Sequence, residues 1–128
     1  MPLNILIVDD SSTLRKIIRR CVTQTEIKFD NIYEAQDGEE ALGLMGQNPI
    51  DIVLSDINMP KMNGIELLTA IKGDAKWKDT AVLMITTEAR AETVLDAAQK
   101  GAVGYIKKPF TPSEIQDQLM PVLKGRAQ

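Results

Sequence analysis

Residues that could do chemistry stand where apolar runs of this sequence end. They are the acidic pair Asp9-Asp10, the carboxylate of Asp56, the hydroxyl of Thr86 and the ammonium group of Lys108. Three carboxylates in one place repel one another and raise one another's pKa, and a bound divalent cation relieves this repulsion. Because the acidic ligand atoms are all oxygens, the pattern favours a hard cation such as Mg²⁺, which often binds beside phosphate.

A carboxylate beside such a cation can also act as a nucleophile. Attack on phosphorus would form an aspartyl-phosphate, and the cation, the lysine and the hydroxyl could then stabilise the phosphoryl oxygens. Each residue also has an ordinary structural explanation, because acids often begin helices and threonine is common in strands. The joint pattern, and no single residue, therefore indicates a site that transfers or receives a phosphoryl group.

Composition excludes several other kinds of chemistry. The chain has 128 residues, a net charge of −3, no histidine and a single cysteine, Cys21. Without an imidazole it holds no Ser-His-Asp triad, no Cys-His pair and no His-ligated metal. One cysteine forms neither an internal disulfide nor a zinc cluster, and Cys21 shares the apolar face of a predicted helix, so we interpret it as core packing. The mildly acidic charge predicts no nucleic-acid partner.

Neither a membrane span nor a targeting segment is visible in the sequence. No apolar run approaches the roughly 18 residues that cross a bilayer, and the amino terminus lacks the basic region of a signal peptide. We therefore expect no membrane partner and a cytoplasmic location.

Alternating strands and helices must position the candidate site. Four mainly apolar runs and one half-polar run predict strands, at Ile5–Val8, Ile50–Leu54, Ala81–Ile85, Val103–Ile106 and, as an edge strand, Asn31–Ala35. Helical patterns separate these runs, so we expect one α/β domain over residues 1–128, a (βα)5 unit with a doubly wound parallel sheet. In such sheets the functional crevice lies beyond the carboxyl ends of the strands.

Local signals define the helices. Capping boxes predict helix starts at Asp37, Asn63 and Thr111, and Gly101 can end a further helix that begins near Arg90. Pro121 interrupts the last helical pattern and predicts a kink or an early end there.

The first helix is predicted to be amphipathic. Its apolar stripe consists of Leu14, Ile17, Ile18, Cys21 and Val22. The basic residues Arg15, Lys16, Arg19 and Arg20 lie on the other face. We interpret that basic face as a solvated surface or as a docking surface for a partner protein.

In order and spacing, a set of residues resembles the receiver domain of bacterial response regulators. The set is Asp9-Asp10, Asp56, Thr86, Tyr105 and Lys108-Pro109. The resemblance covers nearly the whole chain, and within the family it is greatest to the single-domain chemotaxis regulators. It implies a flavodoxin-like fold with strand order 2-1-3-4-5. It also implies a phosphoacceptor switch of a two-component system, which catalyses its own phosphorylation and dephosphorylation and is otherwise not an enzyme.

The resemblance assigns the acidic residues to phosphate and metal. Asp56 is expected to accept the phosphoryl group. Asp9, Asp10 and Asp56 are expected to hold Mg²⁺, with the backbone carbonyl of Asn58 as a further ligand.

The resemblance also gives roles to residues near the last two strands. Thr86 is expected to hydrogen-bond the phosphoryl group and Lys108 to contact it as a cation, while Lys107 points elsewhere. Tyr105 is expected to be an aromatic switch that turns inward when Thr86 moves. The peptide bond between Lys108 and Pro109 is expected to be cis.

Partners follow from the same resemblance. Because the chain has no histidine, the phosphoryl donor must be a phosphohistidine of another molecule, expected to be a chemotaxis histidine kinase. Few residues follow Pro109, so output is expected through contact with a protein target such as the flagellar motor switch. A phosphatase is a further expected partner, and the basic face of the first helix could dock the kinase.

Three other functions remain open from the sequence. A phosphorelay intermediate would use the same site but pass the group to a second histidine protein. A haloacid-dehalogenase-like phosphatase needs an aspartate two residues after its nucleophile, where Ser11 follows Asp9. A flavin-binding module needs a hydroxyl- and glycine-rich phosphate loop, and the acidic pair would repel phosphate without a metal.

Overall fold

The computed structural model describes residues 3–57, 59, 62–77, 79–86, 91–108 and 110–126. Within these residues the strands are β1 (Asn4–Val8), β2 (Asn31–Ala35), β3 (Ile52–Asp56), β4 (Ala81–Thr86) and β5 (Gly104–Lys107). The α-helices are α1 (Ser12–Gln24), α2 (Gly38–Gln47), α3 (Gly64–Lys72), α4 (Ala91–Gln99) and α5 (Pro112–Arg126), and a short 3-10 helix, η1, spans Ala75–Trp77. Strands and α-helices therefore alternate, as predicted.

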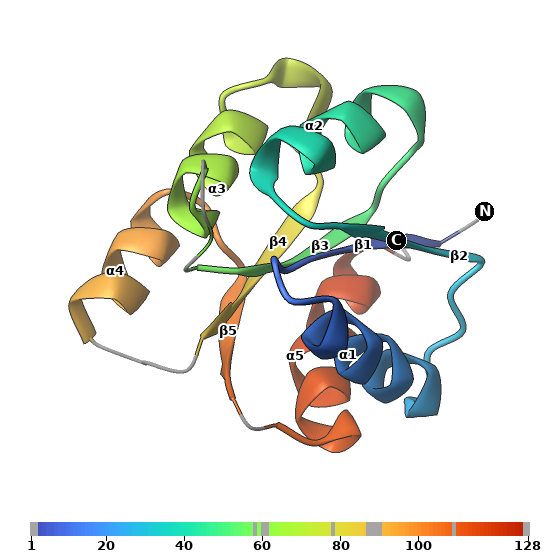
Figure 1. Cartoon of the computed structure of the whole chain (residues 1–128). Helices are drawn as coiled ribbons and strands as arrows, with labels where there is room; N and C mark the ends of the chain where they lie inside the picture. Colours follow the sequence, from blue (N-terminus) through green and yellow to red (C-terminus); the bar gives the residue numbers. More distant parts are fainter. Residues whose placement is uncertain are drawn as a thin grey trace.

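The strands form one parallel sheet in the order β2-β1-β3-β4-β5. Helices α1 and α5 cover one face of this sheet, and α2, α3 and α4 cover the other (Figure 1). The predicted doubly wound (βα)5 fold and its strand order are thus confirmed. Because all strands run in the same direction, their carboxyl ends meet at one edge of the sheet, where ligands bind in such folds.

A hydrophobic core lies on each face of the sheet. Successive strand residues point to opposite faces. In β1, Leu6 and Val8 therefore join the cluster under α2 and α3, and Ile5 and Ile7 join the cluster under α1 and α5. Every residue of β1, β3 and β4 is buried, whereas β2 is half exposed at the sheet edge. Buried Cys21 belongs to the second cluster, and burial raises the pKa of its thiol.

Capping residues begin three of the helices at the predicted positions. Asn63 caps α3 with a complete box: its side chain accepts from the Glu66 amide at 2.8 Å, and the Glu66 carboxylate accepts from the Asn63 amide at 3.1 Å. Asp37 caps α2 and Thr111 caps α5 by accepting from the amide three residues later. These local bonds satisfy amides that have no partner within the helix.

The third strand begins and ends two residues later than predicted. The sequence favoured Ile50–Leu54, but the strand spans Ile52–Asp56. Asp51 instead binds Asn4, because its carboxylate accepts from the Asn4 amide at 2.8 Å and its own amide donates to the Asn4 carbonyl at 3.0 Å. As a consequence, Asp56 is the last residue of a buried strand and does not lie in the following loop. The other strands agree with the prediction to within one residue.

The last helix does not end at Pro121. Helix α5 continues through this residue to Arg126, so of the two predicted outcomes, a kink or an early end, the early end is wrong. Proline leaves the carbonyl of Asp117 without its helical partner. Both residues are exposed, so water can satisfy that carbonyl at no cost to the core.

No helix of the described residues has the length and apolar character needed to cross a membrane.

Candidate functional site

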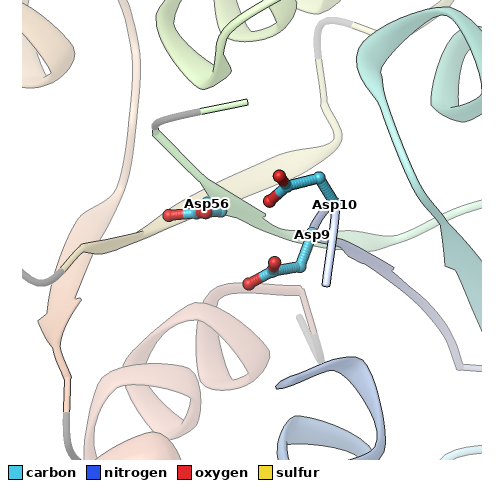
Figure 2. Close-up of side chains that lie close together, drawn as sticks. All are labelled: Asp9, Asp10 and Asp56. Carbon is cyan, nitrogen blue, oxygen red and sulfur yellow. The ribbon is translucent and has the colours of Figure 1, made fainter. Parts of the chain in front are cut away.

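Three carboxylates gather where β1 and β3 end (Figure 2). Asp9 and Asp10 follow β1 and Asp56 ends β3, and one carboxylate oxygen of each lies within 4.8 Å of the others. The two strands are neighbours, with Val8 paired to Ser55, so the residues that follow must lie side by side. Asp9 and Asp56 are buried and Asp10 is exposed. The cluster is therefore open to solvent on the side of Asp10.

Lys108 reaches this cluster from the end of β5. Its Nζ lies 3.1 Å from Oδ2 of Asp9 and 3.5 Å from Oδ1 of Asp56. The side chain is only 10% exposed, whereas the neighbouring Lys107 is exposed. The amide of Lys108 donates to the carbonyl of Thr86 at 2.7 Å, which ties the residue to the end of β4. One cation thus serves two buried carboxylates that would otherwise be costly to bury.

The surroundings of Asp56 shift the pKa of its carboxyl group. Burial raises the pKa of this carboxyl above its ordinary value, and the nearby charge of Asp9 raises it further. The Lys108 ammonium and a hydrogen bond of 2.9 Å from the Ile57 amide oppose the rise without cancelling it. In addition, the three carboxylates of the cluster face the single ammonium group of Lys108, which leaves the cluster with net negative charge.

We predict that Asp56→Asn stabilises the metal-free fold at neutral pH. A carboxyl whose pKa is raised in the folded state favours folding only while it is protonated, and that contribution disappears as the pH rises through the folded pKa. The variant should therefore be more stable than wild type at pH 7 and should lose this advantage in acid. Urea unfolding in excess chelator, measured across pH, checks this; equal stability of the two proteins at pH 7 would contradict it.

The cluster suits a hard divalent cation. Its donors are carboxylate oxygens from two strand ends. The carboxylates of Asp9 and Asp56 are held in fixed positions by burial, and the exposed carboxylate of Asp10 leaves room for water ligands. The expected further ligand, the carbonyl of Asn58, lies outside the described residues, and so does Pro109 with its peptide bond.

Thr86 and Tyr105 lie on neighbouring strands near the cluster. Thr86 ends β4 and is buried, and β4 is next to β3, where Asp56 pairs with Ile85. Tyr105 lies in β5, is 40% exposed and lines a hollow of about 340 Å³ between β5 and α5. The structure thus has the Tyr105 ring at the surface and the Thr86 side chain in the interior.

Arg15 is a residue of the site that helical periodicity assigns to the basic face of α1, interpreted above as a solvated or a docking surface. Its side chain is only 17% exposed, and one guanidinium nitrogen donates to the backbone carbonyl of Asp9 at 2.6 Å. Ile17, which the periodicity placed on the buried stripe, is 48% exposed instead. The available sequence signal was the position of Arg15 in the first turn of the helix that follows the acidic pair.

Comparisons with known proteins agree with this geometry. The response regulator receiver domain family matches residues 5–120. Chemotaxis protein CheY-3 of Vibrio cholerae serotype O1 is 44% identical over 117 residues, which cover 91% of this chain and 88% of that protein. Chemotaxis protein CheY of Pseudomonas aeruginosa is 39% identical over 122 residues, covering 95% of this chain and 97% of that one.

Solved structures show the same architecture. Chemotaxis protein CheY4 of Vibrio cholerae superposes with a TM-score of 0.85 at 32% identity, covering 95% of this chain and 99% of that one. A response regulator receiver domain protein from Clostridium thermocellum superposes with a TM-score of 0.85 at 26% identity, covering 98% and 97%. The chain therefore belongs to the response regulator receiver domain family, the phosphoacceptor signalling switches of two-component systems.

Proposed function

We propose that this chain acts as a single receiver domain over residues 1–128 that accepts a phosphoryl group on Asp56 from a histidine kinase. The observation that carries the proposal is the position of Asp56, at the end of β3 beside Asp9, Asp10 and Lys108. The relatives named as chemotaxis proteins support a role in chemotaxis. With the resemblance to the chemotaxis regulators, this leads us to propose a chemotaxis kinase as donor and a flagellar motor switch protein as target. The cytoplasm, where such a kinase presents its phosphohistidine, is the proposed location.

The chain supplies the nucleophile and the partner supplies the leaving group. A carboxylate oxygen of Asp56 attacks the phosphorus of the phosphohistidine, the P–N bond breaks, and its electron pair returns to the partner's imidazole. Lys108 places a positive charge within 3.5 Å of the attacking carboxylate, where it can stabilise the transferred oxygens. In the separate dephosphorylation step, water attacks phosphorus, the bond to Asp56 breaks, and inorganic phosphate leaves. The side chains that take part in both steps on the acceptor side belong to this chain, so we propose self-catalysed transfer and dephosphorylation.

Asp9, Asp10 and Asp56 would hold Mg²⁺. When bound there, the ion would offset the charge of the three carboxylates and of the arriving phosphoryl group. Lys108 alone, with one positive charge beside three carboxylates, offsets only part of that charge.

Metal dependence tests the proposed function. The purified chain, treated with a small donor such as phosphoramidate, should acquire base-labile phosphate in Mg²⁺ and do so about 100-fold more slowly in excess chelator. Hydrolysis of the labelled protein should slow in chelator as well. Equal rates with and without the metal would overturn the proposal. Adding a second histidine protein and finding the label on it would favour the phosphorelay alternative over an output switch.

Thr86 and Tyr105 are proposed to connect phosphorylation to output. If Thr86 moves toward a phosphoryl group on Asp56, it vacates space that the surface-exposed ring of Tyr105 can fill, which changes the surface of β5 and α5. Wild type should bind its motor target more tightly with the phosphoryl mimic beryllofluoride. Thr86→Ala should take up the mimic and lose most of that gain. A full gain in affinity by this variant, measured in the same binding assay, would disprove the coupling.

A further inference from the structure

Arg15 connects helix α1 to two neighbouring strands. Its guanidinium donates to the carbonyl of Asp9, which follows β1, at 2.6 Å, and its Nε donates to a carboxylate oxygen of Glu34 in β2 at 3.2 Å. The side chain is largely buried, so these contacts are made with little competition from water. A charged donor to a backbone carbonyl in such a place forms a strong hydrogen bond.

The polar groups of Asp9 each have a partner from a different part of the fold. The amide donates to Ala35 at 3.1 Å, Oδ1 accepts from the Ser11 amide at 2.9 Å, and Oδ2 accepts from Lys108 at 3.1 Å. The partner of the carbonyl is Arg15. Arg15 therefore completes the set of bonds that fixes this residue.

The carbonyl that Arg15 holds belongs to the peptide that joins Asp9 to Asp10. That peptide is planar, so its orientation determines where the chain continues and where both carboxylates point. With the carbonyl released, the peptide can rotate, and the exposed Asp10 has no burial to keep it in place. A bond to the Asp9 carbonyl is thus a means of fixing two of the three carboxylates of the cluster.

Glu34 balances the charge of Arg15. An unpaired guanidinium next to a cation pocket would repel the cation, and the Glu34 carboxylate pairs with it instead. Glu34 lies in the edge strand β2, opposite Ile7 of β1. Since β1 ends at Val8, Glu34 is close to the carboxyl end of β1, where Asp9 follows. Arg19, one turn later in α1, also binds Glu34, at 3.0 Å, but its other contact is the carbonyl of Ile32.

We infer that Arg15 is a positioning residue for the divalent cation, acting through the Asp9–Asp10 peptide and held in turn by Glu34. The inference rests on the proposed function, because it assumes that the three carboxylates bind Mg²⁺. The edge strand β2 contributes no metal ligand. Through Glu34 and its contact to Arg15, this strand nevertheless influences metal affinity.

Arg15→Met tests this inference, because methionine keeps the aliphatic length and removes both donated bonds. Its Mg²⁺ dissociation constant, measured by isothermal titration calorimetry, should rise about tenfold, as for other residues that orient metal ligands. In the phosphoramidate assay, the Mg²⁺ concentration for half-maximal rate should rise equally, while the rate at saturating Mg²⁺ stays at the wild-type value. A purely structural role would lower the thermal midpoint in chelator and leave the dissociation constant unchanged.

Arg19→Met is the matched control. It loses the same charge from the same helix and a contact to the other carboxylate oxygen of Glu34, yet leaves the Asp9 carbonyl bonded, so its Mg²⁺ affinity should equal that of wild type. Arg15→Lys provides a second variant that conserves charge: one ammonium cannot bond both Asp9 and Glu34 as the guanidinium does. Its affinity should fall between those of wild type and Arg15→Met, and it carries the test if Arg15→Met does not fold.

Three results would overturn the inference. Unchanged affinity in the folded Arg15 variants would show that the carbonyl bond does not position the metal ligands. An equal loss in Arg15→Met and Arg19→Met would show that only the charge near Glu34 matters. If wild type itself binds no Mg²⁺, both the proposed function and the inference fail. If wild type and the variants bind Mg²⁺ equally well, only the inference fails.

Discussion

Replacing Asp56 with asparagine should abolish phosphorylation of this chain. The amide has no ionised oxygen with which to attack phosphorus, and no other carboxylate of the cluster has the same position at the end of β3 beside Lys108. We expect label from phosphoramidate or from a phosphorylated kinase to fall at least about 100-fold, the scale of losing a reacting group. Base-labile phosphate, measured in Mg²⁺ after equal incubation, checks the result.

Asp51→Asn is the control for that experiment. Asp51 precedes the same strand at its opposite end, and asparagine there can still accept from the Asn4 amide. The control should be labelled like wild type. Full labelling of Asp56→Asn would mean that another residue accepts the phosphoryl group, and it would overturn the assignment of Asp56.

Gly64→Ala should destabilise the fold more than a typical surface substitution does. Gly64 begins α3, and its amide donates to the carbonyl of Ile57 at 2.8 Å. A Cβ at this position would lie 2.8 Å from the Cα of Ile57 and closer still to the carbonyl oxygen of Asp56. Because both obstacles are backbone, the start of α3 and the end of β3 must move apart. We expect the free energy of unfolding to fall by roughly 3 kcal/mol.

The same movement would displace Asp56, so phosphorylation of the folded fraction should also slow. Gly43→Ala is the matched control, because a Cβ added there, in the middle of α2, meets nothing within 4 Å. That variant should gain about 0.5–1 kcal/mol, since alanine favours a helix over glycine. Urea unfolding of both proteins measures the two changes. A Gly64→Ala protein as stable as wild type would contradict this prediction, because it would show that the β3–α3 junction accommodates the added Cβ without loss of stability.

Interactions between near neighbours along the chain explain why so much of this fold could be predicted. A capping box such as that of Asn63 and Glu66 forms within one helical turn, and an apolar run such as Ile5–Val8 is buried as a unit. These signals place the strands and helices, and alternation of the two places the carboxyl ends of parallel strands together. The chemistry of the site could be anticipated for the same reason: Asp9, Asp10 and Lys108 directly follow strands.

Two errors in the prediction arose where a distant partner decided the outcome. Asp51 leaves the predicted strand because of Asn4, which lies 47 residues earlier. The Arg15 side chain is only 17% exposed because Glu34, 19 residues away, and the Asp9 carbonyl bind it, whereas helical periodicity alone assigns it to solvent. A sequence pattern reports the type of each residue and its period along the chain. It contains no information on which strand end packs against which helix.

The sequence by itself determined the order of elements, the oxygen-rich chemistry of the acidic cluster and the exclusion of imidazole chemistry from this chain. Only the tertiary structure decided how that cluster is held. Lys108 reaches Asp9 across 99 residues of chain, Gly64 packs against the Asp56 backbone, and burial leaves Asp56 with a raised pKa. The physical reason is range: hydrogen bonds within a turn follow from adjacent residues, whereas burial, ion pairing and backbone packing depend on the whole folded chain.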